Sequence, residues 1–170
     1  PTQVDLVHTR MHVIGADAAW TIGRYGLRVE GAYVHTQNPS GEDPFIKKPS
    51  VYYVAGIDRD LTEDLNVSVQ AYQRIVINYH DPFTVQGGLA QNVAVLDAVF
   101  NQQLDGVQEG LSGRIKATWL NKALEGELLG VWNANRGDFF VRPSLAYAFT
   151  DTWKGFIGYD IFNGRAHSFF

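Results

Sequence analysis

Apolar residues alternate with polar residues, with a period of two, along most of this 170-residue chain. Because successive side chains of a β-strand point to opposite faces of a sheet, each alternating segment is predicted to be a strand with one apolar and one polar face. Helical spacing is absent from these segments, so the predicted fold class is all-β. The apolar sets of eight predicted strands span residues 14–22, 25–33, 51–61, 65–79, 111–119, 124–132, 139–149 and 153–161.

The lengths of four short loops agree with the register of these strands. Where the apolar set switches between even and odd positions, the hairpin loop must contain an even number of residues, and Gly23-Arg24 and Asn121-Lys122 each provide two. Where the parity does not switch, the loop must be odd, and residues 62–64 and 150–152 each provide three. A slip of one residue would turn every apolar side chain to the other face, so the agreement supports an antiparallel up-and-down order.

The remaining connections are longer and alternate with the short ones. They run over about residues 37–49, 80–109 and 133–138. All short turns would then lie at one end of the strands and all long loops at the other. This sorting is typical of a transmembrane β-barrel, which has short periplasmic turns, long outer loops and strands of roughly nine to eleven tilted residues.

The middle loop contains an apolar pattern with helical spacing. Leu89, Val93, Leu96, Phe100 and Leu104 recur three to four residues apart, which predicts a short amphipathic helix. Two interpretations stay open. The helix packs over the rim of the barrel, or the loop around residues 85–108 folds into the lumen and narrows or plugs it.

The distribution of aromatic residues favours an apolar face that points outward, toward lipid. A soluble barrel of the lipocalin type would instead place its apolar set inside. All four tryptophans belong to the apolar set, and the aromatic residues cluster near both ends of the strands, around a band of aliphatic residues. Such belts are typical of the two membrane interfaces. The predicted interface aromatics are Trp20, Tyr25, Tyr33, Tyr79, Trp119, Trp132, Phe149 and Trp153.

The opposite face carries six basic and six acidic residues, which we expect to line the lumen of the barrel. The register places Arg142 opposite Asp160 and Lys116 opposite Glu127, as pairs that would organise a wet interior. The balance of charges predicts little preference between cations and anions. The predicted pore-lining residues are Asp17, Arg28, Glu30, Asp58, Arg74, Arg114, Lys116, Glu125, Glu127, Arg142, Lys154 and Asp160.

Five aromatic residues also fall on the polar face. They are Tyr52, Tyr72, Phe140, Phe156 and Phe162. They either pack against neighbouring side chains of the lumen or form a stacking track for an amphipathic solute or a sugar.

Composition excludes several other functions. The net charge of −4 leaves no basic patch for nucleic acid, and the absence of cysteine rules out disulfides and thiolate metal sites. His8 and His12 fall at a strand start and predict a polar rim rather than a metal site, and Glu125 and Glu127 face Lys116 as ion-pair partners. No nucleophile has a recognisable base, so we expect no enzyme and no cofactor.

Two segments resemble a known family. The sequences YVAGIDRDLTEDLNVSVQAY and ALEGELLGVWNANRGDFFVRPSLAYAFTDTWKGFIGYDIFNG, in a stretch that runs from about Val51 onward, are similar to the C-terminal part of a poorly characterised family of proteobacterial outer-membrane porin-like proteins. The resemblance implies an outer-membrane barrel of a Gram-negative bacterium and carries over no functional residue. In that family the stretch that matches SFF is followed by a further strand.

Counting strands leads to the same expectation about closure. With periplasmic short turns, eight strands place both chain ends outside the cell, so a closed barrel needs one strand after Phe170 and an odd number before Pro1, at least ten in all. Residues 1–170 are thus expected to be one domain, part of a larger barrel.

The expected function is a porin-like channel for small solutes, whose partner is the lipid bilayer. The alternatives are a soluble barrel that binds a hydrophobic ligand and a plugged membrane barrel that acts as a scaffold or adhesin. The solute and any homo-oligomer are left open.

Overall fold

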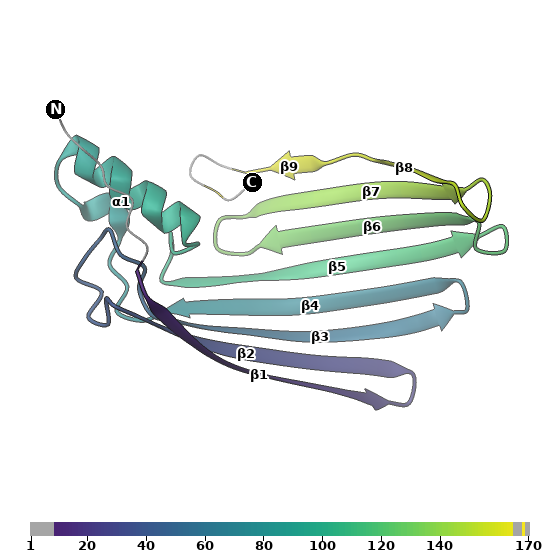
Figure 1. Cartoon of the computed structure of the whole chain (residues 1–170), viewed down its shortest axis with the longest axis horizontal. Helices are drawn as coiled ribbons and strands as arrows, with labels where there is room; N and C mark the ends of the chain where they lie inside the picture. The colour runs from purple at the N-terminus through teal and green to yellow at the C-terminus, as the bar shows by residue number, and fades with distance from the viewer. Residues whose placement is uncertain (1–8, 165–167, 169–170) are drawn as a thin grey trace. The chain divides into compact units, whose positions relative to one another are not determined.

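The structure is a computed structural model that describes residues 9–164 and residue 168 of the chain. It contains one sheet, one α-helix and one short 3-10 helix (Figure 1). The strands are β1 (Met11–Ile22), β2 (Tyr25–Thr36), β3 (Ser50–Thr62), β4 (Leu65–Val76), β5 (Val107–Trp119), β6 (Leu124–Asn133), β7 (Asp138–Ala148), β8 (Lys154–Gly158) and β9 (Ile161–Asn163). The helices are η1 (Pro82–Thr84) and α1 (Gly88–Phe100).

The order of hydrogen-bonded strands follows the order of the chain from β1 to β8, and β9 also pairs with β7. The predicted all-β, antiparallel, up-and-down sheet is therefore confirmed. Among the described residues, β1 does not pair with the last strands, so the sheet is not closed. No helix in the described part of the chain is long and apolar enough to cross a membrane.

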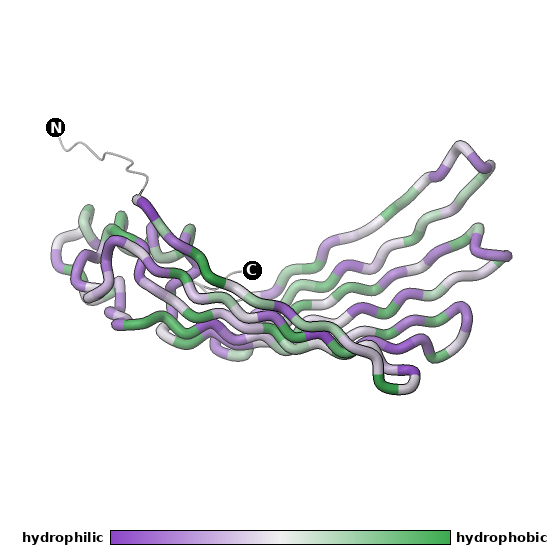
Figure 2. The backbone as a smooth tube through the Cα atoms, turned by 60° about the horizontal axis from the view of Figure 1, so that its bottom comes forward, coloured by the Kyte–Doolittle hydropathy of each residue, from purple (hydrophilic) through white to green (hydrophobic). Residues whose placement is uncertain are grey.

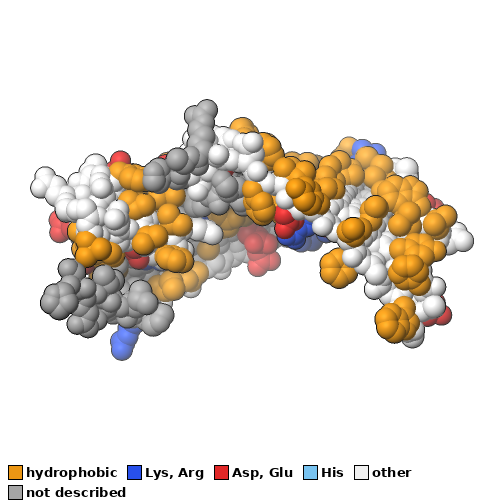
Figure 3. Space-filling view, turned by 90° about the horizontal axis from the view of Figure 1, so that it is seen from above, with side chains coloured by type: hydrophobic (Ala, Val, Ile, Leu, Met, Phe, Trp, Pro, Cys, Tyr) orange, Lys and Arg blue, Asp and Glu red, His pale blue; other side chains and the backbone are white. Residues whose placement is uncertain are grey.

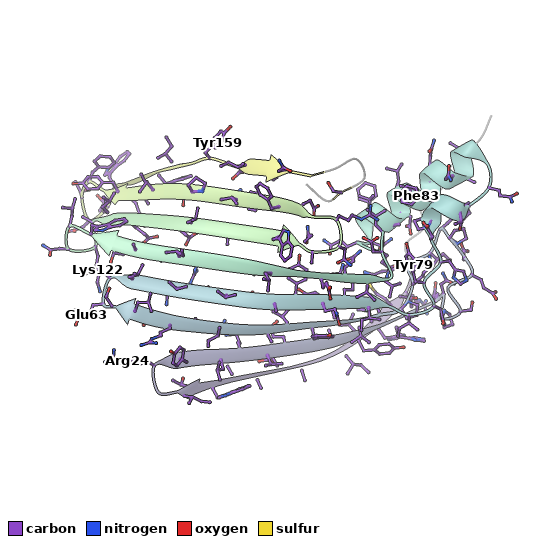
Figure 4. All side chains as sticks on the ribbon, turned by 180° about the vertical axis from the view of Figure 1, so that it is seen from behind. Arg24, Glu63, Tyr79, Phe83, Lys122 and Tyr159 are labelled. Carbon is purple, nitrogen blue, oxygen red and sulfur yellow. The ribbon has the colours of Figure 1, made fainter. Side chains whose placement is uncertain are left out.

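The two-residue hairpins lie where the sequence predicts them. Gly23 and Arg24 separate β1 from β2, and Gly23 adopts a φ of 61°. Asn121 and Lys122 have φ values of 54° and 68°. Positive φ at both central residues is what a tight type I′ turn requires, and it matches the right-handed twist of the flanking strands. The side chains of Arg24, Glu63 and Lys122 mark the turns at this end of the strands in Figure 4.

The two three-residue loops differ slightly from each other. Residues 150–152 form the loop after β7, closed by a hydrogen bond of 3.0 Å from the N–H of Phe149 to the carbonyl of Trp153, as predicted. In the loop before β4, Thr62 is the last residue of β3, and its hydroxyl accepts a hydrogen bond of 3.2 Å from the N–H of Asp64. Strand colours in Figure 2 alternate between hydrophobic and hydrophilic residues, as the period of two requires.

The eighth predicted strand is divided into β8 and β9. The interruption falls at residues 159–160, opposite Pro143 of β7. The N–H of Tyr159 donates to the carbonyl of Pro143 at 3.1 Å, but a proline has no N–H to return. One ladder hydrogen bond is therefore missing at this point, which explains why the pairing stops and resumes.

The described chain divides into two compact units that share strands β1 to β5. Unit 1 comprises residues 1–16, 31–52 and 74–107, and so contains α1 and the long loops. Unit 2 comprises residues 17–30, 53–73 and 108–170, and is made of strands and turns. Every buried hydrophobic side chain of the described residues, Val76, Ala94, Ala98 and Leu104, belongs to unit 1.

Helix α1 lies within the predicted segment, but it buries a different face. It ends at Phe100, and Ala94 and Ala98 are its buried residues. Leu96 and Phe100 of the predicted apolar stripe are 56% and 84% exposed. Leu104 is buried beyond the end of the helix. The small side chains of Ala94 and Ala98 thus allow the helix to pack closely against the rest of unit 1, while Leu96 and Phe100 remain exposed.

The described residues of unit 2 do not form a second layer over its part of the sheet. None of its described hydrophobic side chains is buried, and large hydrophobic side chains are exposed on every strand of the sheet. Figure 3 shows such side chains exposed along the edge formed by β7, β8 and β9. A folded domain in water normally buries the apolar face of a sheet against a second layer. The described residues supply no such layer for the sheet of unit 2.

Candidate functional site

The candidate site is the polar face of unit 2, which we define as the side that carries Arg28, Asp58, Arg114, Glu125 and Arg142. These residues lie on five different strands, β2, β3, β5, β6 and β7. Strand alternation and the confirmed order of strands put their side chains on the same side of the sheet. Of the twelve predicted pore-lining residues, eleven lie in unit 2 and Arg74 lies in unit 1.

A hollow of about 380 Å³ opens on this face. Its lining comes from β2, β3, β4, β5 and β6. Arg28, Asp58 and Arg114 contribute the charged side chains, and the other polar side chains of the lining are Asn66, Ser68, Gln70 and Ser112. A hollow of this volume is comparable to a site for a small molecule, and its lining is mainly polar.

The carboxylate of Asp58 reaches across to the neighbouring strand β2. A Cβ placed at Gly26 would lie 2.7 Å from an oxygen of Asp58. A residue larger than glycine at this position would therefore displace the carboxylate. Gly26 gives Asp58 the room to extend over β2, next to the strand position of Arg28.

A cluster of three charged residues lies closer to the short turns. The ammonium group of Lys116 is 3.1 Å from a carboxylate oxygen of Glu125, and that of Lys154 is 3.8 Å from the same oxygen. The predicted register of Lys116 with Glu127 is confirmed, but the ion pair forms with the diagonal residue Glu125 instead. Lys154 of β8 reaches Glu125 of β6 across β7, where the intervening residue Ala146 is small.

Arg142 and Asp160 form the ion pair that the register predicts. A guanidinium nitrogen of Arg142 donates to a carboxylate oxygen of Asp160 at 2.8 Å, and the contact is bidentate. Phe140 lies under this guanidinium, with 5.2 Å from the charge centre to the ring centroid, and it stacks on Phe162 at 5.0 Å. These two predicted polar-face aromatics therefore pack against neighbours, whereas Phe156 is 88% exposed.

Tyr72 bridges three strands on the same face. Its hydroxyl donates a hydrogen bond to the side-chain oxygen of Asn133, so it passes over Gly110 of the intervening strand β5. A Cβ at Gly110 would lie 2.4 Å from the Tyr72 hydroxyl oxygen and 2.3 Å from the carbonyl oxygen of Trp132. Only glycine, which has no Cβ, leaves room at position 110 for both of these oxygen atoms.

The charged residues of unit 1 gather around the end of α1. Arg74 donates to the carbonyl of Gln102 at 3.1 Å and to its side-chain oxygen at 2.7 Å, and its guanidinium lies 5.2 Å from the ring centroid of Tyr52. Burial raises the pKa of Asp97 above its ordinary value, although a hydrogen bond from Asn101 acts in the opposite direction. Burial likewise lowers the pKa of Lys48.

The remaining predicted polar-face carboxylates are Asp17, Glu30 and Glu127. Within the described residues they form no ion pair. They do not line the hollow of the polar face.

Polar contacts on the apolar face were not found by sequence reasoning. Arg59 lies on this face near the short turns, where its guanidinium donates to the hydroxyl of Tyr25 at 2.5 Å and covers the ring at 4.7 Å. Toward the long loops, Tyr53 donates to Gln73, whose amide donates to Glu109 at 2.9 Å. The sequence could have predicted this placement. Each of these polar side chains has an odd residue number, and the apolar residues of the same strands also have odd numbers, so both lie on the same face of the sheet.

Seven of the predicted interface aromatics are exposed at a strand end or in the adjoining turn, between 38% for Tyr33 and 75% for Trp153. Tyr79 differs, because β4 ends at Val76 and Asn78 adopts a φ of 53°. The hydroxyl of Tyr79 donates to the carbonyl of Leu104 at 2.6 Å, which fixes the ring within the long connection (Figure 4).

In the described part of the chain, no three histidine, cysteine, aspartate or glutamate side chains converge as a metal site would need. His8, one of the histidines considered above, lies outside the described residues. No protein family, no curated protein and no solved structure was found to match this chain. The resemblance to porin-like proteins therefore stays a prediction.

Proposed function

We propose that this chain is part of an outer-membrane β-barrel whose apolar face meets lipid and whose polar face lines a water-filled pore for small solutes. The observation that carries the proposal is the contrast between the two faces of unit 2. One face exposes hydrophobic side chains that no described residue buries, and the other holds a polar hollow and the ion pairs. A soluble monomer rarely exposes so continuous an apolar surface, whereas a membrane barrel requires it.

The polar face supports a water-filled interior rather than an apolar ligand pocket. Its ion pairs involve side chains that are between 30% and 56% exposed. Ion pairs of this kind are stable in contact with water and would be costly to bury in an apolar cavity. A soluble barrel with a hydrophobic ligand inside would need the opposite orientation, with Arg142 and Lys116 on its outer surface and the tryptophans within.

The orientation of the two faces is tested with single cysteines, because the natural sequence contains none. Glu127→Cys and Leu128→Cys are neighbours that point to opposite faces of β6. Each variant, reconstituted in lipid vesicles, carries an environment-sensitive fluorophore on its cysteine. We expect brominated lipids to quench the label at position 128 and aqueous iodide to quench the label at position 127. The reverse pattern, or equal quenching at both positions, would contradict the proposed orientation.

Conduction is tested separately, in planar bilayers that contain the protein. Discrete current steps are expected from an open pore, and their size would bound the width of the barrel. A protein that inserts with the expected orientation but gives no steps would refute the pore. That result would favour a barrel plugged by the loop around residues 85–108, or a scaffold.

A further inference from the structure

The polar face of unit 2 carries five of the predicted basic residues and six of the predicted acidic ones, and these residues differ in their pairing. In unit 2, Lys116 and Lys154 have Glu125 as their partner, and Arg142 has Asp160. Arg28 and Arg114 form no ion pair and no hydrogen bond with any residue that the structure describes. Both line the hollow of about 380 Å³. The basic residues of this face that have no ion-pair partner therefore lie at one site.

One carboxylate of this face belongs to the lining of the hollow itself. Asp17, Glu30 and Glu127 do not line the hollow, whereas Asp58 does. Two guanidinium groups and one carboxylate leave a net charge of one positive unit in the lining. A guanidinium presents parallel N–H donors that match the two oxygens of a carboxylate. The charge is thus suited to a solute with a single negative charge.

The uncharged part of the lining supplies hydrogen-bonding groups. Asn66, Ser68, Gln70 and Ser112 contribute amide and hydroxyl groups. The amide nitrogen of Asn66 donates to Asp60 at 2.7 Å, while its buried side-chain oxygen has no hydrogen-bond partner among the described residues. A buried acceptor of this kind favours a ligand that brings a donor. A hydroxyl group on the solute would provide one.

We propose that this hollow is a binding site for small hydroxylated monocarboxylates. The inference rests on the proposed pore function and names the solute class of that same face. Arg28 and Arg114 bind the carboxylate, and the amide and hydroxyl groups bind the solute hydroxyls. Asp58 disfavours a second negative charge.

The experiment compares Arg28→Gln and Arg114→Gln with Arg24→Gln, which removes the same charge from the turn between β1 and β2, outside the hollow. The reversal potential in a KCl gradient gives the ratio of anion to cation permeability. We expect this ratio to fall about threefold in each hollow variant, as expected for one unit charge acting through water over ~6 Å. The turn variant should retain the wild-type ratio.

Lactate is the probe for the solute class, with glycerol as its neutral counterpart and ethanolamine as its cationic one. Lactate should reduce the chloride current of the wild-type protein, and glycerol and ethanolamine should not. Arg114→Lys keeps the charge but loses the paired donors, so it should preserve the wild-type permeability ratio and weaken the lactate block. Asp58→Asn should increase the block by the dianion malate.

The failures of the two proposals are distinguishable. If current steps occur but the hollow variants match the wild type in permeability ratio and in lactate block, the binding site is refuted and the pore stands. Lactate binding to the protein in detergent, measured by calorimetry, provides a readout that does not need a pore. Binding that is lost in Arg28→Gln and Arg114→Gln, without any current steps, would support the site and refute the pore. Absence of binding to the folded wild-type protein would refute the site.

Discussion

The close passage of Tyr72 over Gly110 makes a quantitative prediction about stability. Replacing Gly110 with alanine would place a methyl carbon 2.3 Å from the carbonyl oxygen of Trp132 and 2.4 Å from the hydroxyl oxygen of Tyr72. Both distances are about 1 Å inside the ~3.5 Å optimum for non-bonded heavy atoms. The side chain of Tyr72 can move away, but the carbonyl of Trp132 belongs to the backbone of the adjacent strand β6. The substitution must therefore separate β5 from β6 locally.

The expected loss of stability follows from three contributions. Overpacking costs about 1–3 kcal/mol, and the lost hydrogen bond between Tyr72 and Asn133 costs about 1 kcal/mol. Alanine restricts the unfolded chain, which returns about 0.4–1 kcal/mol. Gly110→Ala should thus lower the free energy of unfolding by about 1–3.5 kcal/mol.

The assay is urea unfolding of the protein in detergent micelles, followed by tryptophan fluorescence. Gly130→Ala is the matched control, because a Cβ there would meet its nearest neighbour, the carbonyl oxygen of Phe140, at 3.9 Å, an ordinary contact. The control should unfold at the wild-type urea concentration or slightly above it. In Gly110→Ala, the additional change Tyr72→Ser should not restore stability, because the clash with the backbone carbonyl persists. Wild-type stability of Gly110→Ala, or full rescue by Tyr72→Ser, would refute the backbone clash.

Three further predictions use the same unfolding assay. Lys122→Gly should stabilise the protein by about 1 kcal/mol, because the φ of 68° at this turn position disfavours any residue with a Cβ, and Lys122→Ala should give no such gain. Glu125→Gln removes the shared partner of Lys116 and Lys154 and should cost about 0.5 kcal/mol, a difference that molar salt abolishes if the contribution is electrostatic. Burial raises the pKa of Asp97 in the folded protein above its value in the unfolded chain, so the folded state binds this proton more tightly. The resulting stabilisation is complete below the pKa of the unfolded chain and is lost as the pH rises through the raised pKa of the folded protein. Asp97→Asn should therefore raise the urea midpoint at about pH 7 and have no effect near pH 3, and a lower midpoint at neutral pH would contradict this sign.

The sheet could be predicted from the sequence because two independent signals agree. The period of two places each strand, and the parity of each short loop fixes the register of the next one. The division between β8 and β9 could have been anticipated from Pro143, but only once its register opposite residues 159–160 was known. The buried face of α1 could not be predicted, since hydrophobic spacing favours the large residues and the helix packs through Ala94 and Ala98.

The sequence predicts which charged residues share the polar face, but it does not predict which of them form ion pairs with one another. Side-chain parity assigns Lys116, Glu125 and Glu127 to one face, yet it does not show that Lys116 selects Glu125 over its direct neighbour Glu127. Long side chains reach diagonal positions as readily as opposite ones, and the choice depends on the twist of the sheet and on the small residue that Lys154 must cross. A count of charges is therefore a poor guide to the selectivity of such a face.

The energetics of unit 2 favour the membrane over water as the environment of its apolar face. Ordering the backbone of a residue costs about 1–2 kcal/mol, and a net hydrogen bond returns only about 1 kcal/mol. In soluble domains the difference is supplied by burial of large apolar side chains, at about 1.5–3 kcal/mol each. Unit 2 buries none of its described hydrophobic side chains, so its ladder hydrogen bonds are left without this contribution. In the proposed barrel, a lipid bilayer would supply it for every exposed valine, leucine, isoleucine and tryptophan of the apolar face. It also makes the ladder obligatory, because unpaired backbone groups are costly in hydrocarbon.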